Sequence, residues 1–356
     1  MKYLGLIVIA YLFIAGEAFS QTKLFEMQRV ADGIFAFVSS DPTKDIVNGN
    51  SVAIVCEKSV VVFDANSTPG EARAVLAEIR KLTDKPVRYV VNSHWHWDHW
   101  LGNQVYKEAF PDCEIISSSE TRRIIEARFQ RFYKSEMEGS DELIRTFKEE
   151  LNKGKKKNGD SLTNYEKIRW AQTIQDAEFG FAEEKNLRYT PPTMVFEQGM
   201  TLFMGDREIR IQNLGPGNTT GDAFVYLPKE KILLTGDLLV SPVPYAFGVT
   251  PRNWIRILKA FDEMDVTTII PGHGAVQYNK DYLKAVIEMF ESITDQVTTH
   301  MKNGVGKDDL KSLVNVENFR KKFADTDPAK NYVFDLYFVK PFVDRAFKET
   351  QGEIGQ

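Results

Sequence analysis

Cysteine is almost absent from this chain of 356 residues, and its scarcity excludes two classes of protein. The two cysteines, Cys56 and Cys113, stand in no C-x-x-C spacing, so neither a cysteine-ligated zinc module nor a disulfide-rich scaffold is indicated. Export would permit a disulfide between them. Free cysteines are commonly buried, however, and two separate buried strand cysteines are the plainer expectation. Pairing stays open on the sequence alone.

The chain also lacks an excess of positive charge, since its net charge is −5. An acidic balance disfavours the phosphate backbone of a nucleic acid as a partner. The sequence contains no G-x-S-x-G, no phosphate-binding loop and no dinucleotide glycine pattern. Serine hydrolase, nucleoside triphosphatase and dehydrogenase functions are therefore not supported.

No apolar run reaches the roughly 20 residues of a membrane span. The uncharged stretch 3–16 follows Lys2 and precedes Ala18-Phe19-Ser20, which has the small-x-small pattern of a cleavage site. We therefore expect residues 1–20 to be a secretory signal peptide, with an uncleaved anchor as the alternative. The mature chain is then periplasmic or secreted, without stable membrane insertion.

What the sequence does contain is a repeated order of elements. Strands, then a helix, then another strand are expected in the first half and again in the second. Thr68-Pro69-Gly70-Glu71 supplies a helix cap, a proline at the first helical position and an acidic residue three positions after the cap. Apolar runs rich in β-branched residues predict strands, and apolar residues at helical spacing predict helices. In the first half we expect strands at 52–56, 60–63 and 87–92 and a helix at 72–82; in the second, strands at 209–214, 223–227, 232–234 and 267–270 and a helix starting at Thr250-Pro251.

Two regions do not follow this pattern. Residues 118–190 are long, polar and helical in spacing, and we interpret them as a helical hairpin insertion. Residues 281–356 carry an apolar helical stripe and read as a helical C-terminal extension packed on the same domain. The expected organisation is one domain over residues 21–280, with that insertion and that tail.

Histidine is scarce as well, yet three of the five histidines fall in one short segment, His94-x-His96-x-Asp98-His99. If the strand before this segment continues briefly, His94 and His96 point to the same side, because side chains alternate along a strand. Asp98 and His99 follow where the chain must turn, and can present a carboxylate and an imidazole to a second cation. Histidine and carboxylate ligands suit zinc, so the segment predicts a metal site.

This segment resembles the signature of the metallo-β-lactamase superfamily. Thr235-Gly236-Asp237 resembles the motif whose aspartate bridges two metals, and Pro271-Gly272-His273-Gly274 resembles the motif of the final histidine ligand. The resemblance covers about residues 25–120 and 195–280. It implies an α/β fold, an αββα sandwich with a dinuclear site at one edge, to which the helical insertion and the helical C-terminal tail are added.

One motif departs from the family pattern. The segment Gly217-Asn218-Thr219 stands where the family usually has Gly-His-Thr, so Asn218 replaces a histidine ligand. An amide oxygen is a neutral and weaker zinc ligand. The resemblance implies metal ligation by His94, His96, Asp98, His99, Asn218, Asp237 and His273. We expect Zn, one or two ions, with the half containing Asp98 filling first and the occupancy of the other half open.

The expected chemistry is hydrolysis by a metal-bound hydroxide, because zinc lowers the pKa of its bound water to about 7. Asp98 is the expected catalytic residue, orienting that water as well as ligating. Asp222 either holds a ligating imidazole or caps a turn. Trp95 and Trp97 are expected to point away from the metal into packing. Tyr245 and its neighbour Phe247 either line a substrate pocket or pack their own loop.

Three functions remain open at this point. The leading one is a zinc-dependent hydrolase acting on a small-molecule amide, lactam, lactone or ester, and the scaffold alone does not choose among these substrates. The second is an iron-dependent oxidoreductase of the same fold. The third is a non-catalytic metal-binding member, because of Asn218.

Overall fold

The fold is described from a computed structural model that covers residues 24–39, 48–171, 173–174 and 187–354. The expected signal peptide, residues 1–20, lies outside the described residues. Within those ranges, no helix combines the length and the apolar character that crossing a bilayer requires.

The first sheet has seven strands in chain order, antiparallel from β1 to β4 and parallel from β4 to β7. Its strands are β1 (Phe25–Ala31), β2 (Ile34–Ser39), β3 (Ser51–Val55), β4 (Val60–Phe63), β5 (Val87–Val91), β6 (Glu114–Ser118) and β7 (Met194–Phe196).

The second sheet has five strands in the order β12-β11-β10-β9-β8. All neighbours are antiparallel except β11 and β12, which run parallel. Its strands are β8 (Gly199–Met204), β9 (Arg207–Gln212), β10 (Phe224–Leu227), β11 (Ile232–Leu234) and β12 (Thr268–Ile270).

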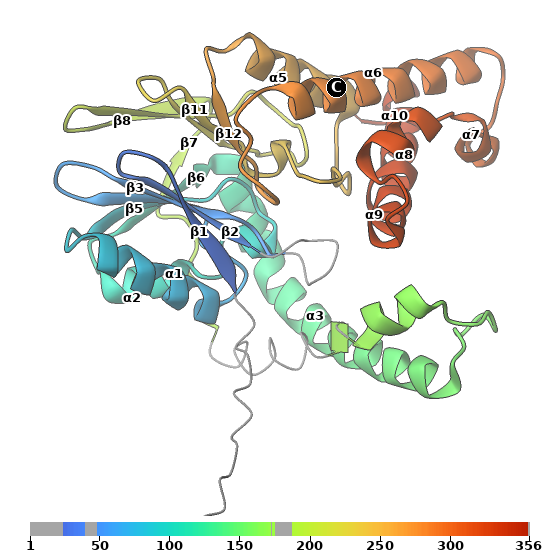
Figure 1. The fold of residues 1–356 in the computed structure, drawn as a ribbon, viewed down its shortest axis with the longest axis horizontal. Coiled ribbons are helices and arrows are strands. Elements are labelled where there is room, and N and C mark those ends of the chain that lie inside the picture. Colours follow the sequence, from blue (N-terminus) through green and yellow to red (C-terminus); the bar gives the residue numbers. More distant parts are fainter. Residues whose placement is uncertain (1–23, 40–47, 172, 175–186, 355–356) are drawn as a thin grey trace, which may run out of the picture.

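The two sheets pack face to face, and helices cover both outer faces (Figure 1). Helices α1 (Pro69–Leu82) and α2 (Asn103–Ala109) lie on the first sheet, and α5 (Pro251–Glu263) and α6 (Asp281–Lys302) lie on the second. This is the αββα sandwich that the sequence predicted, and the prediction is confirmed.

The central strands are apolar on both faces because each face has its own core. In β10, Phe224 packs with the outer helices while Val225 packs between the sheets. In β4, Val62 packs under α1 while Val61 packs between the sheets. Alternating side chains therefore all find apolar partners, which is why these strands read as continuous hydrophobic runs.

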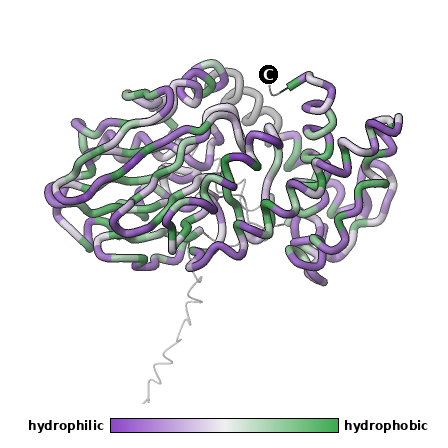
Figure 2. The backbone as a smooth tube through the Cα atoms, turned by 90° about the horizontal axis from the view of Figure 1, so that it is seen from above, coloured by the Kyte–Doolittle hydropathy of each residue, from purple (hydrophilic) through white to green (hydrophobic). Residues whose placement is uncertain are grey.

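Seen from above, hydrophobic stretches of the tube run through the stacked layers, whereas many of the connecting segments at the rim are hydrophilic (Figure 2).

Helix α1 begins as predicted, since Thr68 and Glu71 form a reciprocal capping box and Pro69 follows the cap. The strand predicted at 209–214 occupies Arg207–Gln212, and β5 ends at Val91, one residue early.

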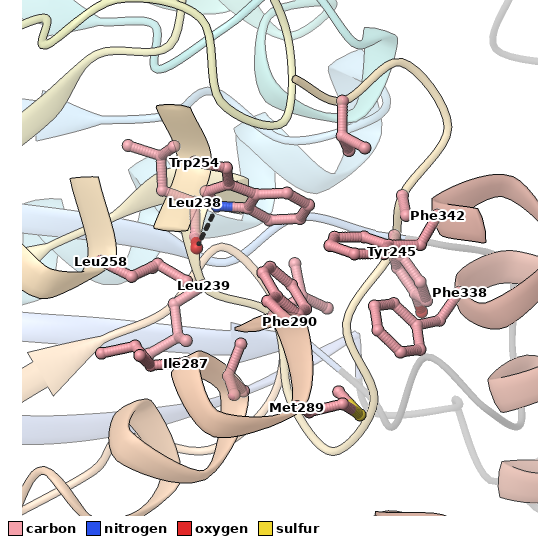
Figure 3. Packing of buried hydrophobic residues seen from close by; sticks show 14 of the residues in the cluster. Leu238, Leu239, Tyr245, Trp254, Leu258, Ile287, Met289, Phe290, Phe338 and Phe342 are labelled. Carbon is pink, nitrogen blue, oxygen red and sulfur yellow. Dashed lines mark hydrogen bonds between the residues drawn. The ribbon is translucent and has the colours of Figure 1, made fainter. Parts of the chain in front are cut away.

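Helices follow His273 to the end of the described chain, as the sequence predicted. After α6 come α7 (Lys307–Leu313), α8 (Glu317–Phe323), α9 (Pro328–Val333), the π-helix η3 (Phe334–Val339) and α10 (Lys340–Thr350). Trp254 of α5 packs on Phe290 of α6, and Phe290 packs on Phe338 and Phe342 (Figure 3). The extension thus shares one core with the sandwich.

The insertion begins with the long helix α3 (Ser119–Lys153), which leads away from the sheets (Figure 1). Residues 164–171 are helical again and return along it. The ring of Phe147 lies 4.7 Å from that of Trp170, and Trp170 donates a hydrogen bond to Glu150. These contacts join the two helical segments as a hairpin.

Candidate metal centre

The predicted ligands follow three strands that end at the same edge of the sandwich. The segment 94–99 follows β5, Asp237 follows β11 in the short helix η2 (Gly236–Leu238), and His273 follows β12. Leu234 pairs with Ile270 in the parallel ladder of β11 and β12. Since Asp237 and His273 each come three residues after those paired positions, the ladder brings them side by side.

Six predicted ligands form two groups of three, each with ligand atoms within 4.8 Å of one another. The first group contains His94, His96 and Asp237, and the second contains Asp98, His99 and His273. We call them the first triad and the second triad.

Asp237 also joins the two triads. Its Oδ2 lies 3.5 Å from Nε2 of His94 in the first triad. Its Oδ1 lies 3.3 Å from Nε2 of His99 and 3.2 Å from Nε2 of His273 in the second. One carboxylate therefore faces both triads with different oxygens.

The donor atoms of the second triad fit a divalent cation. Oδ2 of Asp98 lies 3.1 Å from Nε2 of His273 and 3.2 Å from Nε2 of His99. These three atoms and Oδ1 of Asp237 are buried and have no hydrogen-bond partner among the described residues. Buried polar atoms normally have partners, so four unpartnered ones facing each other indicate a bound ion. Imidazole and carboxylate donors suit zinc-like metals.

Asn218, in the loop between β9 and β10, is a further candidate ligand. It is 1% exposed, and neither its amide oxygen nor its amide nitrogen has a partner within the described chain. Its loop lies beside the first triad, because Ala223 donates a backbone hydrogen bond to Ser93 O. Ligation by Asn218 stays a prediction.

Asp222 holds that loop and does not hold an imidazole. Its Oδ2 accepts hydrogen bonds from the amides of Gly217 and Thr219, and its Oδ1 accepts one from the hydroxyl of Thr219. Of the two roles that the sequence left open, the turn-capping role is the one observed. The carboxylate fixes the residues on either side of Asn218.

Asp64, at the end of β4, was not identified from the sequence. Its Oδ2 lies 2.8 Å from Nδ1 of His99, and the same carboxylate accepts hydrogen bonds from the amide and hydroxyl of Ser93. The Ser93 hydroxyl lies 2.9 Å from Nδ1 of His94. One buried carboxylate thus orients a histidine of each triad, the usual arrangement around metal-binding histidines. Its φ of 60° is one that aspartate tolerates.

Two glycines allow the backbone to approach the centre closely. A Cβ on Gly272 would collide with the Asp237 carboxylate and the backbone of Gly236. Gly236 has a φ of +51°, and a Cβ there would meet Ser93. A side chain at Gly272 would displace Asp237, and one at Gly236 would displace Ser93, whose hydroxyl lies beside His94.

Opposite charges control the protonation of the centre. Burial alone would lower the pKa of His99 and His273, but Asp98 and Asp237 outweigh it and raise the pKa of His273 to about 9 and that of His99 well above its usual value. Burial acts to raise the pKa of Asp237, but the neighbouring imidazoles bring it well below its ordinary value. The pKa of His96 falls to about 3 through burial and the proximity of His94. The carboxylates therefore stay charged and attract cations.

His94 and His96 converge, but not through the strand alternation that was predicted for them. The strand ends at Val91, so strand alternation does not align the two imidazoles. They meet in the bend that follows, with Nε2 of His94 at 2.9 Å from Nδ1 of His96. Their convergence comes from the turn before η1 (Trp97–His99).

The tryptophans of the motif pack against the start of α3. Trp95 lies edge-on to the ring of His96 at 4.3 Å, and the guanidinium of Arg128 lies 4.1 Å from its ring centre. Trp95, Trp97 and Trp100 line a small recess with residues of α3.

Among the other candidates, Tyr245 is buried with its ring centre 5.7 Å from that of His273, whereas Phe247 is 54% exposed. Cys56 and Cys113 are free and buried as expected, but each lies next to the end of a strand and not within one.

A family model described as the metallo-beta-lactamase superfamily matches residues 45–273 of the chain. A linear primary-alkylsulfatase from Pseudomonas sp. (strain ATCC 19151) is 23% identical over 276 residues, which cover 72% of this chain and 48% of that protein. The chain therefore spans about half the length of this curated relative.

Solved structures show the same fold. The stereoselective inverting sec-alkylsulfatase Pisa1 from Pseudomonas sp. matches with a TM-score of 0.61 and 14% identity, over 91% of this chain and 50% of that one. A double mutant of the sec-alkyl sulfatase PisA1 matches with the same TM-score and identity over 93% of this chain and 51% of that one. A metallo-beta-lactamase from Pontibacter korlensis matches with a TM-score of 0.50 and 15% identity, over 75% and 99%.

Proposed function

This chain belongs to the metallo-beta-lactamase superfamily, and from that premise we propose that it is a zinc-dependent hydrolase of small organic esters, with sulfate monoesters as the first substrate class. The observation that carries the proposal is Asp237, whose two carboxylate oxygens face separate groups of buried donor atoms. Such a donor set supports two adjacent cations, an arrangement common in hydrolases.

Sulfate monoesters come first because the similar proteins named above include alkylsulfatases that match most of this chain. The wider class of amides, lactams, lactones and carboxylic esters is the next to be tested, because one scaffold carries many activities. Bound zinc supplies Lewis acidity and lowers the pKa of water in such sites.

Asp98 is the residue that we assign to orienting the attacking water. Although burial acts to raise its pKa, the imidazoles of His99 and His273 lower it below its ordinary value. A carboxylate with so low a pKa accepts a hydrogen bond but does not retain a proton at neutral pH. Its role is therefore to fix the direction of the water.

The second triad is proposed to load first. It has two imidazoles and the Asp98 carboxylate, with Oδ1 of Asp237 beside them. The first triad has two imidazoles and Oδ2 of Asp237, and its further candidate ligand, Asn218, is neutral. A neutral amide binds zinc less strongly than an imidazole does.

We also propose that the mature protein acts in the periplasm or outside the cell. This proposal rests on residues 1–20, whose sequence has the order of a secretory signal peptide. N-terminal sequencing of the exported protein tests it, with a mature chain beginning near residue 21 as the expected result.

The function is tested by metal analysis together with a substrate panel. We expect one to two zinc ions per chain, and chelator-sensitive hydrolysis of hexyl sulfate or 4-nitrophenyl sulfate that zinc restores. The panel also contains 4-nitrophenyl acetate, a lactone and a chromogenic cephalosporin. Asp237→Asn should lose metal and activity, while Asp206→Asn on the surface should lose neither.

Three results would overturn the proposal in different ways. Hydrolysis confined to another ester class would replace the substrate but retain the hydrolase. Stoichiometric iron with redox activity would indicate the oxidoreductase instead. A metal-loaded protein inert to the whole panel would indicate a binding protein.

A further inference from the structure

The loop between η2 and α5 is fixed at both of its sides. Ala246 donates a backbone hydrogen bond to Tyr337 O in the π-helix η3, and the guanidinium of Arg345 in α10 donates a hydrogen bond to Val249 O. The amide of Thr250 bonds to Gly217 O in the loop of Asn218. Tyr245 therefore sits on a segment held between the C-terminal extension and the metal centre.

The phenol of Tyr245 is buried beside a metal ligand without a partner of its own. The side chain is 3% exposed, and its ring centre lies 5.7 Å from those of both His273 and Tyr337. Its hydroxyl has no hydrogen-bond partner among the described residues. Buried tyrosine hydroxyls usually find partners, and leaving one unpaired costs about 1–3 kcal/mol.

The position of this phenol suits a donor to the centre. A tyrosine hydroxyl can donate a hydrogen bond. This hydroxyl has no acceptor among the described residues, and its ring adjoins His273 of the second triad.

We propose that Tyr245 is a catalytic residue whose hydroxyl donates a hydrogen bond to a substrate oxygen held at the second triad, and that the neighbouring aromatic side chains bind the substrate's organic group. The inference rests on the proposed hydrolase function and adds to it the residues that recognise the substrate.

The aromatic side chains form a continuous series that we call the aromatic wall. Phe247 lies 6.1 Å from Tyr245 and 5.2 Å from Tyr337 between ring centres. Tyr337 lies 6.4 Å from Tyr332, which lies 5.6 Å from Tyr165. The wall therefore runs from a ligand of the centre, along the C-terminal extension, to the helical insertion.

The exposure along the wall suits an organic ligand. Phe247 is 54% exposed although it adjoins a buried phenol, and Tyr332 and Tyr337 are only partly buried. Aromatic surfaces with a few placed polar groups are typical of small-molecule sites. An aromatic or extended hydrocarbon group is the matching ligand chemistry.

A cation completes the recognition surface. Arg169 comes four residues after Tyr165 in the helical segment 164–171, so the two side chains lie on the same face of that helix. The ring of Tyr165 lies 5.6 Å from that of Tyr332 in the wall. A positive charge at this place favours an anionic ester over a neutral one.

The hydroxyl is tested by Tyr245→Phe in the zinc-loaded protein. We expect kcat to fall about 10²-fold, the effect of removing one donor to a developing negative charge, while zinc content stays unchanged and Tm does not fall. Tyr282→Phe is the matched control, because its hydroxyl donates to Val240 O and should affect stability but not kcat. A kcat within twofold of the parent for Tyr245→Phe would overturn the catalytic role.

The wall is tested by Phe247→Ser, with Phe203→Ser as the matched control on a remote strand where the side chain is 76% exposed. KM for octyl sulfate should rise about tenfold and KM for ethyl sulfate should not change, since burying each methylene gains about 0.8 kcal/mol. Equal effects on both esters, or none, would contradict the wall.

A binding assay separates this inference from the proposed function. Calorimetric titration with 1-octanesulfonate, which has no ester bond to hydrolyse, should show binding to the zinc-loaded parent and weaker binding to Phe247→Ser and Arg169→Met. If no sulfate ester is hydrolysed but octanesulfonate binds in this way, the proposed hydrolase function is wrong and the proposed recognition surface is supported. If the sulfonate does not bind the parent, the recognition surface fails.

Discussion

Asn218 is the residue at which this chain departs from the family pattern, and its position can be tested directly. Its amide is buried and lacks a described partner, and Asp222 fixes the residues on either side of it. An imidazole in the same place would be a stronger ligand than an amide.

We therefore expect Asn218→His to bind a second zinc ion about 10-fold or more tightly than the parent. Substitution of residues that hold metal ligands typically changes metal affinity by at least this factor. Competition with a chromophoric chelator measures both affinities. Unchanged stoichiometry and affinity would place Asn218 away from the first triad.

Glu71 gives a residue-scale prediction that concerns stability and not the metal. Burial raises the pKa of its carboxyl from 4.5 to about 7. The folded state therefore retains a proton that the unfolded state releases between those values. The resulting stability is present below pH 4.5 and is lost as the pH rises through 7.

Glu71→Gln keeps hydrogen-bond capacity but cannot ionise, so its stability lacks this pH dependence. Relative to the parent, it should gain roughly 3 kcal/mol of unfolding free energy between pH 4 and pH 8, the equivalent of the pKa shift. Urea denaturation across that range measures the difference. A difference that does not vary with pH would show that Glu71 ionises normally.

Individual residues also show which parts of the site could be predicted from the sequence. The six residues of the two triads could be predicted as candidate ligands because the segment His94-x-His96-x-Asp98-His99, Asp237 and His273 each belong to a recognisable motif. Asp64 could not, because it is one aspartate after an apolar strand and its role depends on Ser93 and His99 lying beside it in space. The same limit applies to Tyr245, whose unpaired hydroxyl is a property of its surroundings.

At the scale of elements, the start of α3 fastens the loop that carries Asn218. The hydroxyls of Ser118 and Thr121 both donate to Gly221 O, while Ser118 also caps the helix by accepting from the amide of Thr121. A Cβ on Gly221 would lie 2.7 Å from the Thr121 hydroxyl, so the two elements are in close contact.

Thr121→Val removes one of these buried hydrogen bonds without changing the shape of the side chain. It should lower the unfolding free energy by about 1–2 kcal/mol and weaken binding at the first triad more than at the second. Thr294→Val is the control, because the buried hydroxyl of Thr294 bonds to Phe290 O within α6. Equal effects of the two substitutions on zinc affinity would show that α3 does not position the loop.

The elements that could be predicted are those with one dominant signal. Strands β4, β10, β11 and β12 are buried on both faces, so their apolar runs stand out. Strand β1 mixes partly buried and exposed residues without regular alternation, and β8 has three exposed positions, so neither has a comparable run. Pairing with a neighbouring strand, which is a tertiary effect, makes them strands.

At the scale of the whole molecule, the C-terminal extension completes the core of the second sheet. Phe290 of α6 is fully buried against Trp254 of the sandwich and against Phe338 and Phe342 of the extension. Without these helices, the outer face of α5 would be exposed to water, at about 25 cal/mol for each Å² of apolar surface.

A chain ending at residue 280 should therefore fail to fold cooperatively. We expect aggregation or a broad thermal transition with strong binding of a hydrophobic dye, compared with a sharp transition for a chain ending at residue 350. Matching sharp transitions for the two chains would show that the sandwich folds by itself.

The residues of the metal centre are far apart in the sequence, and their order determines at which stage of synthesis the centre can bind ions. Asp64 and the histidines that it orients leave the ribosome well before Asp237 and His273 do. An ion captured early would meet imidazoles without the carboxylate that links the triads, and metal binding of this kind is coupled to completion of the fold. Metal acquisition is thus an event of the finished polypeptide, and the ions on offer are those of the compartment in which it matures.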